Sequence, residues 1–142
     1  MIPGLPQDID QIKGFLAEDE ALALYQNALE ASALGPVLEI GSYCGKSTIY
    51  LGLACRASGS TLFALDHHRG SEEHQPGEFF HDPELFDAGE GVMDSFKAFR
   101  RNISAAELDD VVVPLVSDSR TTARHWRTPF GMVFIDGGHS LD

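Results

Sequence analysis

The chain has 142 residues, 43% of them apolar, and its 22 acidic and 10 basic residues give a formal net charge of -12. This length suits one domain, 1–142, with a buried core. The acidic balance repels nucleic-acid phosphates and anionic lipid, so we expect neither nucleic acid nor a membrane as a partner. No apolar run approaches the length that crosses a bilayer.

The cysteine content points to a reducing compartment. Two cysteines, Cys44 and Cys55, are too few for a disulfide framework. The N-terminus also lacks the basic, apolar and small-residue pattern of a secretory signal. We therefore expect reduced thiols and a cytoplasmic protein.

Apolar periodicity and Gly/Pro punctuation predict helices that alternate with strands. A lead at 1–18, with a short helix at 9–15, precedes a helix at 19–34. The elements that follow are a strand at 37–41, a helix at 47–57, a strand at 61–66, a helix at 92–103, a strand at 111–117, a short helix at 121–126 and a strand at 132–136. This alternation predicts an α/β fold: a doubly wound, Rossmann-like, mainly parallel sheet with helices on both faces.

Segment 67–91 is the exception to this alternation. It is polar and longer than ordinary connections, and loops of such length are usually functional or disordered. The apolar pairs Phe79-Phe80 and Leu85-Phe86 within it are available to close on a ligand. We expect this segment to form a lid over a cofactor or an acceptor.

The stretch LEIGSYCGKST, residues 38–48, resembles a phosphate-binding loop at first sight. A nucleoside triphosphate loop has four residues between its glycines, whereas only Ser42, Tyr43 and Cys44 separate Gly41 from Gly45. The stretch also lacks the G-x-G-x-x-G spacing of a dinucleotide site. It retains an acid at the end of a strand, a glycine turn and the beginning of a helix.

Each predicted strand ends in an acid or is followed directly by one. These acids are Glu39, Asp66, Asp118 and Asp136. In open parallel sheets, ligands bind beyond the carboxyl ends of the strands, where an acid accepts ribose hydroxyls. The helix that begins near Ser47 points N–H groups toward a carboxylate. A ligand with an amino-acid head, a ribose and an adenine fits these groups, and S-adenosylmethionine has all three.

Four stretches in chain order, VLEIGSYCGKST, FALD, VSDS and FIDGGHS, resemble the motifs of class I S-adenosylmethionine-dependent methyltransferases. The first is especially similar to the catechol-type and natural-product O-methyltransferases, which have E-x-G-x-Y-x-G-x-S there. The likeness covers roughly residues 20–142. It implies methyl transfer from S-adenosylmethionine to a hydroxyl of a small-molecule acceptor.

The resemblance also implies roles for single residues. The methionine moiety would be held by the glycine loop and the helix after it, at Glu39, Gly41, Ser42, Tyr43 and Ser47. Asp66 would take the ribose hydroxyls, His67 would lie beside or against the adenine, and Asp118 and Ser119 would meet the adenine edge.

In the metal-dependent members of the resembled family, the acid at Asp136 binds a divalent cation, for which oxygen ligands suggest Mg²⁺. His139 would then be the general base that takes the acceptor proton. Gly137 and Gly138 replace the bulkier residues of the catechol branch, as in the sugar and natural-product branch. The family's sheet normally continues for about three further strands. We therefore expect a C-terminally truncated, cofactor-binding half whose exposed strand edge favours a homo-oligomer.

Other interpretations of the same residues stay open. Glu39 and Asp66 could be polar strand ends, Asp118 could simply cap a helix, and His139 could belong to a C-terminal tail. Two other functions compete with methyl transfer. One is a nucleotide-binding hydrolase, which the short loop disfavours, and the other is a non-catalytic remnant that still binds S-adenosylmethionine.

Overall fold

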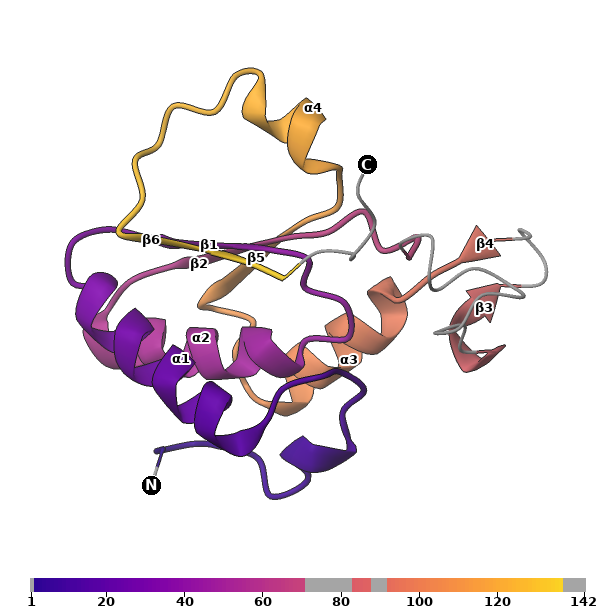
Figure 1. Ribbon diagram of the computed structural model, residues 1–142, viewed down its shortest axis with the longest axis horizontal. Coiled ribbons are helices and arrows are strands. Elements are labelled where there is room, and N and C mark those ends of the chain that lie inside the picture. Colours follow the sequence, from indigo (N-terminus) through magenta and orange to yellow (C-terminus); the bar gives the residue numbers. More distant parts are fainter. Residues whose placement is uncertain (1, 71–82, 88–91, 137–142) are drawn as a thin grey trace.

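The computed structural model describes residues 2–70, 83–87 and 92–136 (Figure 1). Its main sheet is formed by β1 (Val37–Ile40), β2 (Leu62–Leu65), β5 (Val112–Leu115) and β6 (Met132–Ile135). The α-helices are α1 (Glu18–Ala31), α2 (Lys46–Ser58), α3 (Phe96–Ala105) and α4 (Ser119–Ala123). A 3-10 turn, η1 (Ile9–Gln11), stands where the short N-terminal helix was expected.

The four strands of the main sheet are parallel and lie in the order β5-β2-β1-β6. The chain therefore builds outward from β1 through β2 to β5 and then returns to the other side of β1 with β6. This reversal is the topological switch point, next to which open α/β sheets bind ligands. The predicted doubly wound parallel sheet is confirmed.

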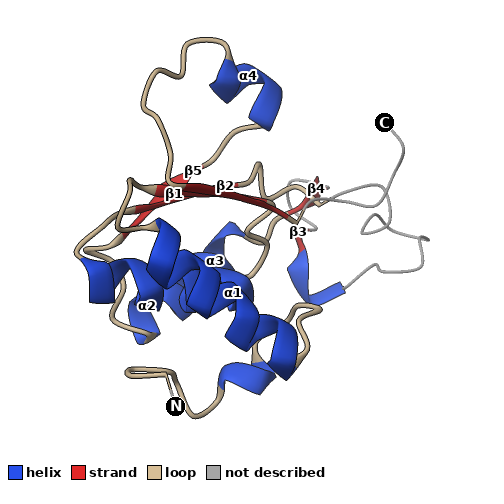
Figure 2. Cartoon of the chain, turned by 60° about the vertical axis from the view of Figure 1, so that its left-hand side comes forward, coloured by secondary structure: helices blue, strands red, loops and turns tan. Residues whose placement is uncertain are grey.

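Helices lie on both faces of the sheet, but unequally. Helices α1, α2 and α3 cover one face, and the short helix α4 lies on the other (Figures 1 and 2). Helix α2 is buried on all sides from Ser47 to Cys55, because it packs between the sheet and the other helices. The main core lies in this layer, and Val37, Ile49, Leu51, Leu62 and Phe99 are among its fully buried side chains.

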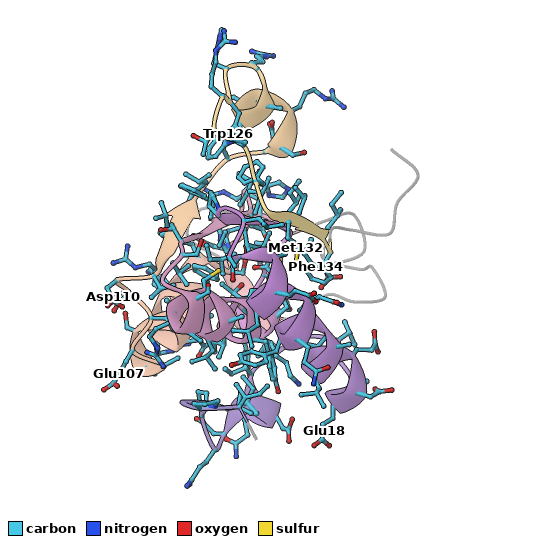
Figure 3. All side chains as sticks on the ribbon, turned by 90° about the vertical axis from the view of Figure 1, so that its left-hand side faces the viewer. Glu18, Glu107, Asp110, Trp126, Met132 and Phe134 are labelled. Atoms are coloured by element: carbon cyan, nitrogen blue, oxygen red, sulfur yellow. The ribbon has the colours of Figure 1, made fainter. Side chains whose placement is uncertain are left out.

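On the α4 side, aromatic side chains cover part of the sheet. Phe63 of β2 meets Trp126 edge-to-face at 5.1 Å between ring centroids, and Trp126 stacks on Phe130 at 5.3 Å. Figure 3 shows Trp126 on this side and Met132 and Phe134 of β6 on the side of α1. Val133 and Ile135, which alternate with them, are 48% and 70% exposed.

The long segment after β2 contains structure that the sequence did not indicate. A 3-10 turn, η3 (Pro83–Leu85), leads into β3 (Phe86–Asp87), which pairs antiparallel with β4 (Val92–Met93). Leu85 and Met93 are buried with Cys44 of the glycine loop. The rest of the expected lid, 71–82 and 88–91, lies outside the described residues, and the lid stays a prediction.

The predicted helix at 92–103 began too early. Val92 belongs to β4, and α3 begins at Phe96, whose backbone N–H donates to the Asp94 carboxylate at 2.9 Å. Helical spacing from Val92 to Phe96 was therefore coincidental. Among the described residues, no helix has the length and apolarity needed to cross a membrane.

Gly131, just before β6, allows a close approach of two backbone segments. A Cβ at this position would lie 2.2 Å from the Ala31 carbonyl oxygen and 2.9 Å from that of Gly35. Gly131→Ala should lower the free energy of unfolding by about 3 kcal/mol, because neither backbone oxygen can rotate away. Urea unfolding followed by circular dichroism measures this loss.

Gly59→Ala is the matched control. Gly59 ends α2 with a φ of +73°, and a Cβ added there would meet no described atom within 4 Å, so only backbone strain of about 1–2 kcal/mol is expected. Equal losses for the two variants would contradict the steric argument for Gly131.

Candidate functional site

The carboxyl ends of the four parallel strands lie level with one another. Backbone hydrogen bonds continue past the strands, from the Asp136 N–H to the Ile40 carbonyl at 2.8 Å, and from the Gly41 N–H to the Leu65 carbonyl at 2.8 Å. The Asp66 N–H likewise donates to the Leu115 carbonyl at 3.1 Å. The residues that follow β1, β2 and β6 therefore meet at one edge, beside the topological switch point.

The loop from β1 to α2 closes in a tight turn. Gly41, Tyr43 and Gly45 have φ values of +95°, +52° and +97°. A Cβ on Gly45 would lie 3.3 Å from both Phe99 and Ile103, so this glycine is needed for space as well as for its φ. Within the described chain no side chain caps α2, and its first N–H groups face the loop without helical carbonyl partners. Such a helix N-terminus is suited to a carboxylate or phosphate.

Glu39 of β1 is fully buried beneath this loop. Its carboxyl accepts hydrogen bonds from the Ser47 hydroxyl at 2.5 Å and from the Thr48 hydroxyl, both in the first turn of α2. Burial raises the pKa of Glu39 from 4.5 to about 7, although the hydroxyls of Ser47, Thr48 and Ser42 lower it, and Asp136 raises it slightly. Glu39 therefore has a structural role, since it joins β1 to α2.

Ser42 contributes a buried hydroxyl that has no hydrogen-bond partner among the described residues. The residue is 2% exposed. Its oxygen lies near enough to Glu39 to lower the pKa of that carboxyl, but the two groups do not have the geometry of a hydrogen bond. A buried hydroxyl without a partner is unfavourable unless a ligand satisfies it. Ser42 thus marks a place where a polar ligand group would be stabilised.

Asp66 connects two loops at the site. Its Oδ2 accepts from the Tyr43 N–H at 2.7 Å, and its Oδ1 accepts from the His68 N–H at 2.9 Å. Each carboxylate oxygen keeps a further acceptor position. The side chain is half-buried, so a ligand at the strand ends could donate to it.

The residues expected around the adenine are exposed. His67 accepts the Arg69 N–H at its Nδ1 at 2.9 Å. The pKa of Asp118 is lowered chiefly by the Thr121 N–H, which donates to Asp118 at 2.6 Å and makes Asp118 the N-cap of α4. The capping interpretation of Asp118 is therefore confirmed, and it leaves carboxylate acceptor capacity for a ligand. Ser119 is the first residue of α4.

The sequence did not reveal that His68 is buried and that its neighbour His67 is exposed. It is 2% exposed, with a φ of +63°, and its Nδ1 lies 2.8 Å from the Ser95 hydroxyl. Its ring lies 5.2 Å and 5.1 Å from the Phe96 and Phe99 centroids. Burial lowers the pKa of His68, and the nearby Asp66 and Asp94 carboxylates oppose this effect only in part. Sequence reasoning also missed the contact of Thr48 with Glu39. Its only indication in the sequence was a second hydroxyl residue directly after Ser47.

The proposed metal and base residues are described only in part. Asp136 is exposed at the end of β6, and His139 lies outside the described residues. Within 2–70, 83–87 and 92–136, no three His, Cys, Asp or Glu side chains gather as a metal site would require. The described residues therefore do not fit Mg²⁺ by themselves, and both assignments stay predictions.

Comparison with known proteins agrees with this geometry. A family model described as a methyltransferase domain matches residues 38–142, which includes every strand end of the site. The chain belongs to this methyltransferase family. The resemblance inferred from the sequence is thereby confirmed.

Solved structures share the methyltransferase fold. A methyltransferase from Podospora anserina with bound S-adenosylhomocysteine has 14% identity and a TM-score of 0.65, and the match covers 94% of this chain and 51% of that one. The O-methyltransferase TomG from Streptomyces achromogenes, in complex with S-adenosylmethionine, has 16% identity and a TM-score of 0.62, and the match covers 94% of this chain and 54% of TomG. An O-methyltransferase from Bacillus cereus with S-adenosylhomocysteine has 24% identity and a TM-score of 0.58, and the match covers 90% of this chain and 49% of that one. The chain spans about half the length of these proteins.

The buried carboxyl of Glu39 should make stability depend on pH. Because folding raises its pKa from 4.5 to about 7, the folded chain binds more protons than the unfolded chain between these values. The resulting stabilisation is complete below pH 4.5 and is lost as the pH rises through 7. The expected loss is about 3 kcal/mol, from about 1.4 kcal/mol per pH unit.

Glu39→Gln should remove this part of the pH dependence, because glutamine stays neutral. Urea unfolding at pH 5 and pH 8 would measure it as the difference between variant and wild type. Glu30→Gln, at an exposed position on α1, is the control and should retain the wild-type pH dependence. If the free energy of unfolding changes with pH equally in Glu39→Gln and in the wild type, folding does not raise the pKa of Glu39.

Proposed function

We propose that this methyltransferase-family chain binds S-adenosylmethionine at the carboxyl ends of β1, β2, β5 and β6, for methyl transfer to a hydroxyl of a small molecule. The observation that carries the proposal is Asp66, whose carboxylate is oriented by the N–H groups of Tyr43 and His68. In the loop that contains Tyr43, the buried Ser42 hydroxyl has no hydrogen-bond partner among the described residues. Family membership and the cofactors named in the related structures support it.

The proposed cofactor has groups that match those of the site. The glycine loop and the start of α2 would hold its methionine moiety, through Glu39, Gly41, Ser42, Tyr43 and Ser47. The Ser47 hydroxyl donates to Glu39, so Ser47 would contribute its backbone N–H at the helix N-terminus. Asp66 would accept the ribose hydroxyls, and His67, Asp118 and Ser119 would surround the adenine.

The chemistry requires an acceptor hydroxyl that loses its proton. S-adenosylmethionine, when bound, supplies an electrophilic methyl group on its sulfonium. His139 would be the general base, since a histidine near neutral pH can remove a hydroxyl proton. Asp136 could help to bind Mg²⁺ only with ligands beyond the described residues, so we assign no step to a cation.

A hydrolase is not favoured, because the turn from Gly41 to Gly45 is too short to wrap a triphosphate. A non-catalytic cofactor-binding domain remains the alternative, as the chain spans about half the length of its structural relatives. We further propose a cytoplasmic location, supported by two buried free thiols, Cys44 and Cys55.

Asp66→Ala should weaken the binding of S-adenosylhomocysteine about 10- to 100-fold. The ribose hydroxyls would lose a charged acceptor whose hydrogen bonds contribute about 1.5–3 kcal/mol. Titration calorimetry would measure the affinity. Asp110→Ala removes an exposed acid that precedes β5, at the amino ends of the strands and so away from the proposed site, and should leave the affinity for S-adenosylhomocysteine unchanged. Wild-type affinity in Asp66→Ala would refute the ribose assignment.

His139→Gln should lower kcat about 10²- to 10⁴-fold without changing the affinity for S-adenosylhomocysteine, because general-base catalysis contributes to the chemical step alone. Transfer of a radiolabelled methyl group to a panel of phenols and sugars would measure kcat. His125→Gln, at an exposed position after α4, is the control. A wild-type chain that binds the cofactor but methylates no acceptor would favour the non-catalytic alternative.

A further inference from the structure

Glu39 is a buried acid that lacks a counter-cation within the described part of the chain. Its carboxyl is 0% exposed and contacts the hydroxyls of Ser47 and Thr48. The charged group that acts on it is another acid, Asp136, which increases the cost of a negative charge at Glu39. No described lysine, arginine or histidine forms an ion pair with it.

A buried carboxyl in this position keeps its proton to a higher pH than an exposed one. Burial raises the pKa of Glu39 to about 7, so the protonated and ionised forms are similarly populated near neutral pH. The two hydroxyls suit either form, because a hydroxyl can donate to a carboxylate or accept from a carboxylic acid. A cation brought next to Glu39 would therefore shift this balance toward the ionised form.

The surroundings of Glu39 are suited to an amino-acid head. The N-terminus of α2, which no described side chain caps, favours a carboxylate, and the Ser42 hydroxyl, buried beside Glu39, lacks a hydrogen-bond partner there. A zwitterion with its carboxylate at the helix N-terminus would bring its ammonium toward Ser42 and Glu39. That ammonium is the counter-cation that Glu39 lacks.

We infer that the cofactor's ammonium displaces the proton of Glu39, so that cofactor binding and release of one proton to solvent are linked. This inference rests on the proposed function, since it concerns the same cofactor site. The neutral acid loses a proton to water, and the carboxylate that remains pairs with the ammonium. No bond of the cofactor is broken.

The linkage has a defined sign. Below pH 7, binding must release the Glu39 proton, so affinity rises with pH. With a pKa of about 7, affinity should increase about fivefold from pH 6 to pH 7 and level off above it. The amino group of the ligand stays charged at pH 6, because α-amino groups have pKa values of about 7.7–8.0.

Calorimetry in buffers of different ionisation enthalpy would count the protons. S-adenosylhomocysteine is titrated into the complete chain at pH 6.0 in MES, bis-tris and imidazole, with EDTA present to exclude cations. Nearly one released proton per bound ligand is expected for the wild type. Glu39→Gln should bind with almost no proton release. 5′-Methylthioadenosine, which has the adenine and ribose but no amino-acid head, should bind the wild type without proton release.

The outcomes distinguish the inference from the proposed function. Absence of binding heat and of any affinity for S-adenosylhomocysteine would refute the proposed function, and the inference with it. Binding without buffer-dependent heat would overturn the inference alone, as would equal proton release in Glu39→Gln. If Glu39→Gln does not fold, the two ligands still decide the question on the wild-type chain, since equal release with 5′-methylthioadenosine would exclude the ammonium as the cause.

Discussion

The hydrogen bonds from the first turn of α2 to the buried Glu39 carboxyl are the constraint that shapes the site. They attach the start of the helix to β1 through Ser47 and Thr48. The intervening chain must then reverse between Gly41 and Gly45, which explains its positive φ values and the need for glycine against Phe99. A short loop of this kind leaves the helix N-terminus open toward the sheet edge instead of wrapping a phosphate.

A second carboxylate links the loop after β1 to the turn after β2. Asp66 accepts N–H groups from Tyr43, in the loop after β1, and from His68, in the turn after β2. His68 is in turn held by Ser95 and the aromatic rings at the start of α3. The Asp66 carboxylate, which is proposed to accept hydrogen bonds from the ribose, is therefore oriented before any ligand arrives. Less conformational freedom of this side chain remains to be lost on binding.

The two faces of the sheet differ in how they are covered. Helices α1, α2 and α3 bury one face, whereas Trp126 and Phe130 cover Phe63 on the other and leave Val133 and Ile135 of β6 exposed. The groups proposed to hold the cofactor lie at the carboxyl ends of the strands and in the loops and helix starts that follow them, all within the described chain. The acceptor site is different, because the described residues form no metal cluster and do not include His139.

The alternation of helices and strands, the parallel sheet, the glycine loop and the acids at the strand ends could all be predicted from the sequence. These features depend on local periodicity, on φ-specific residues and on strand polarity, which can be recognised within short stretches. Other features exist only in the folded chain. Burial of His68 instead of His67, the pairing of Val92 in β4 and the contact of Thr48 with Glu39 depend on neighbours distant in sequence. So does the raised pKa of Glu39, because desolvation is a property of the folded surroundings and not of the glutamate itself.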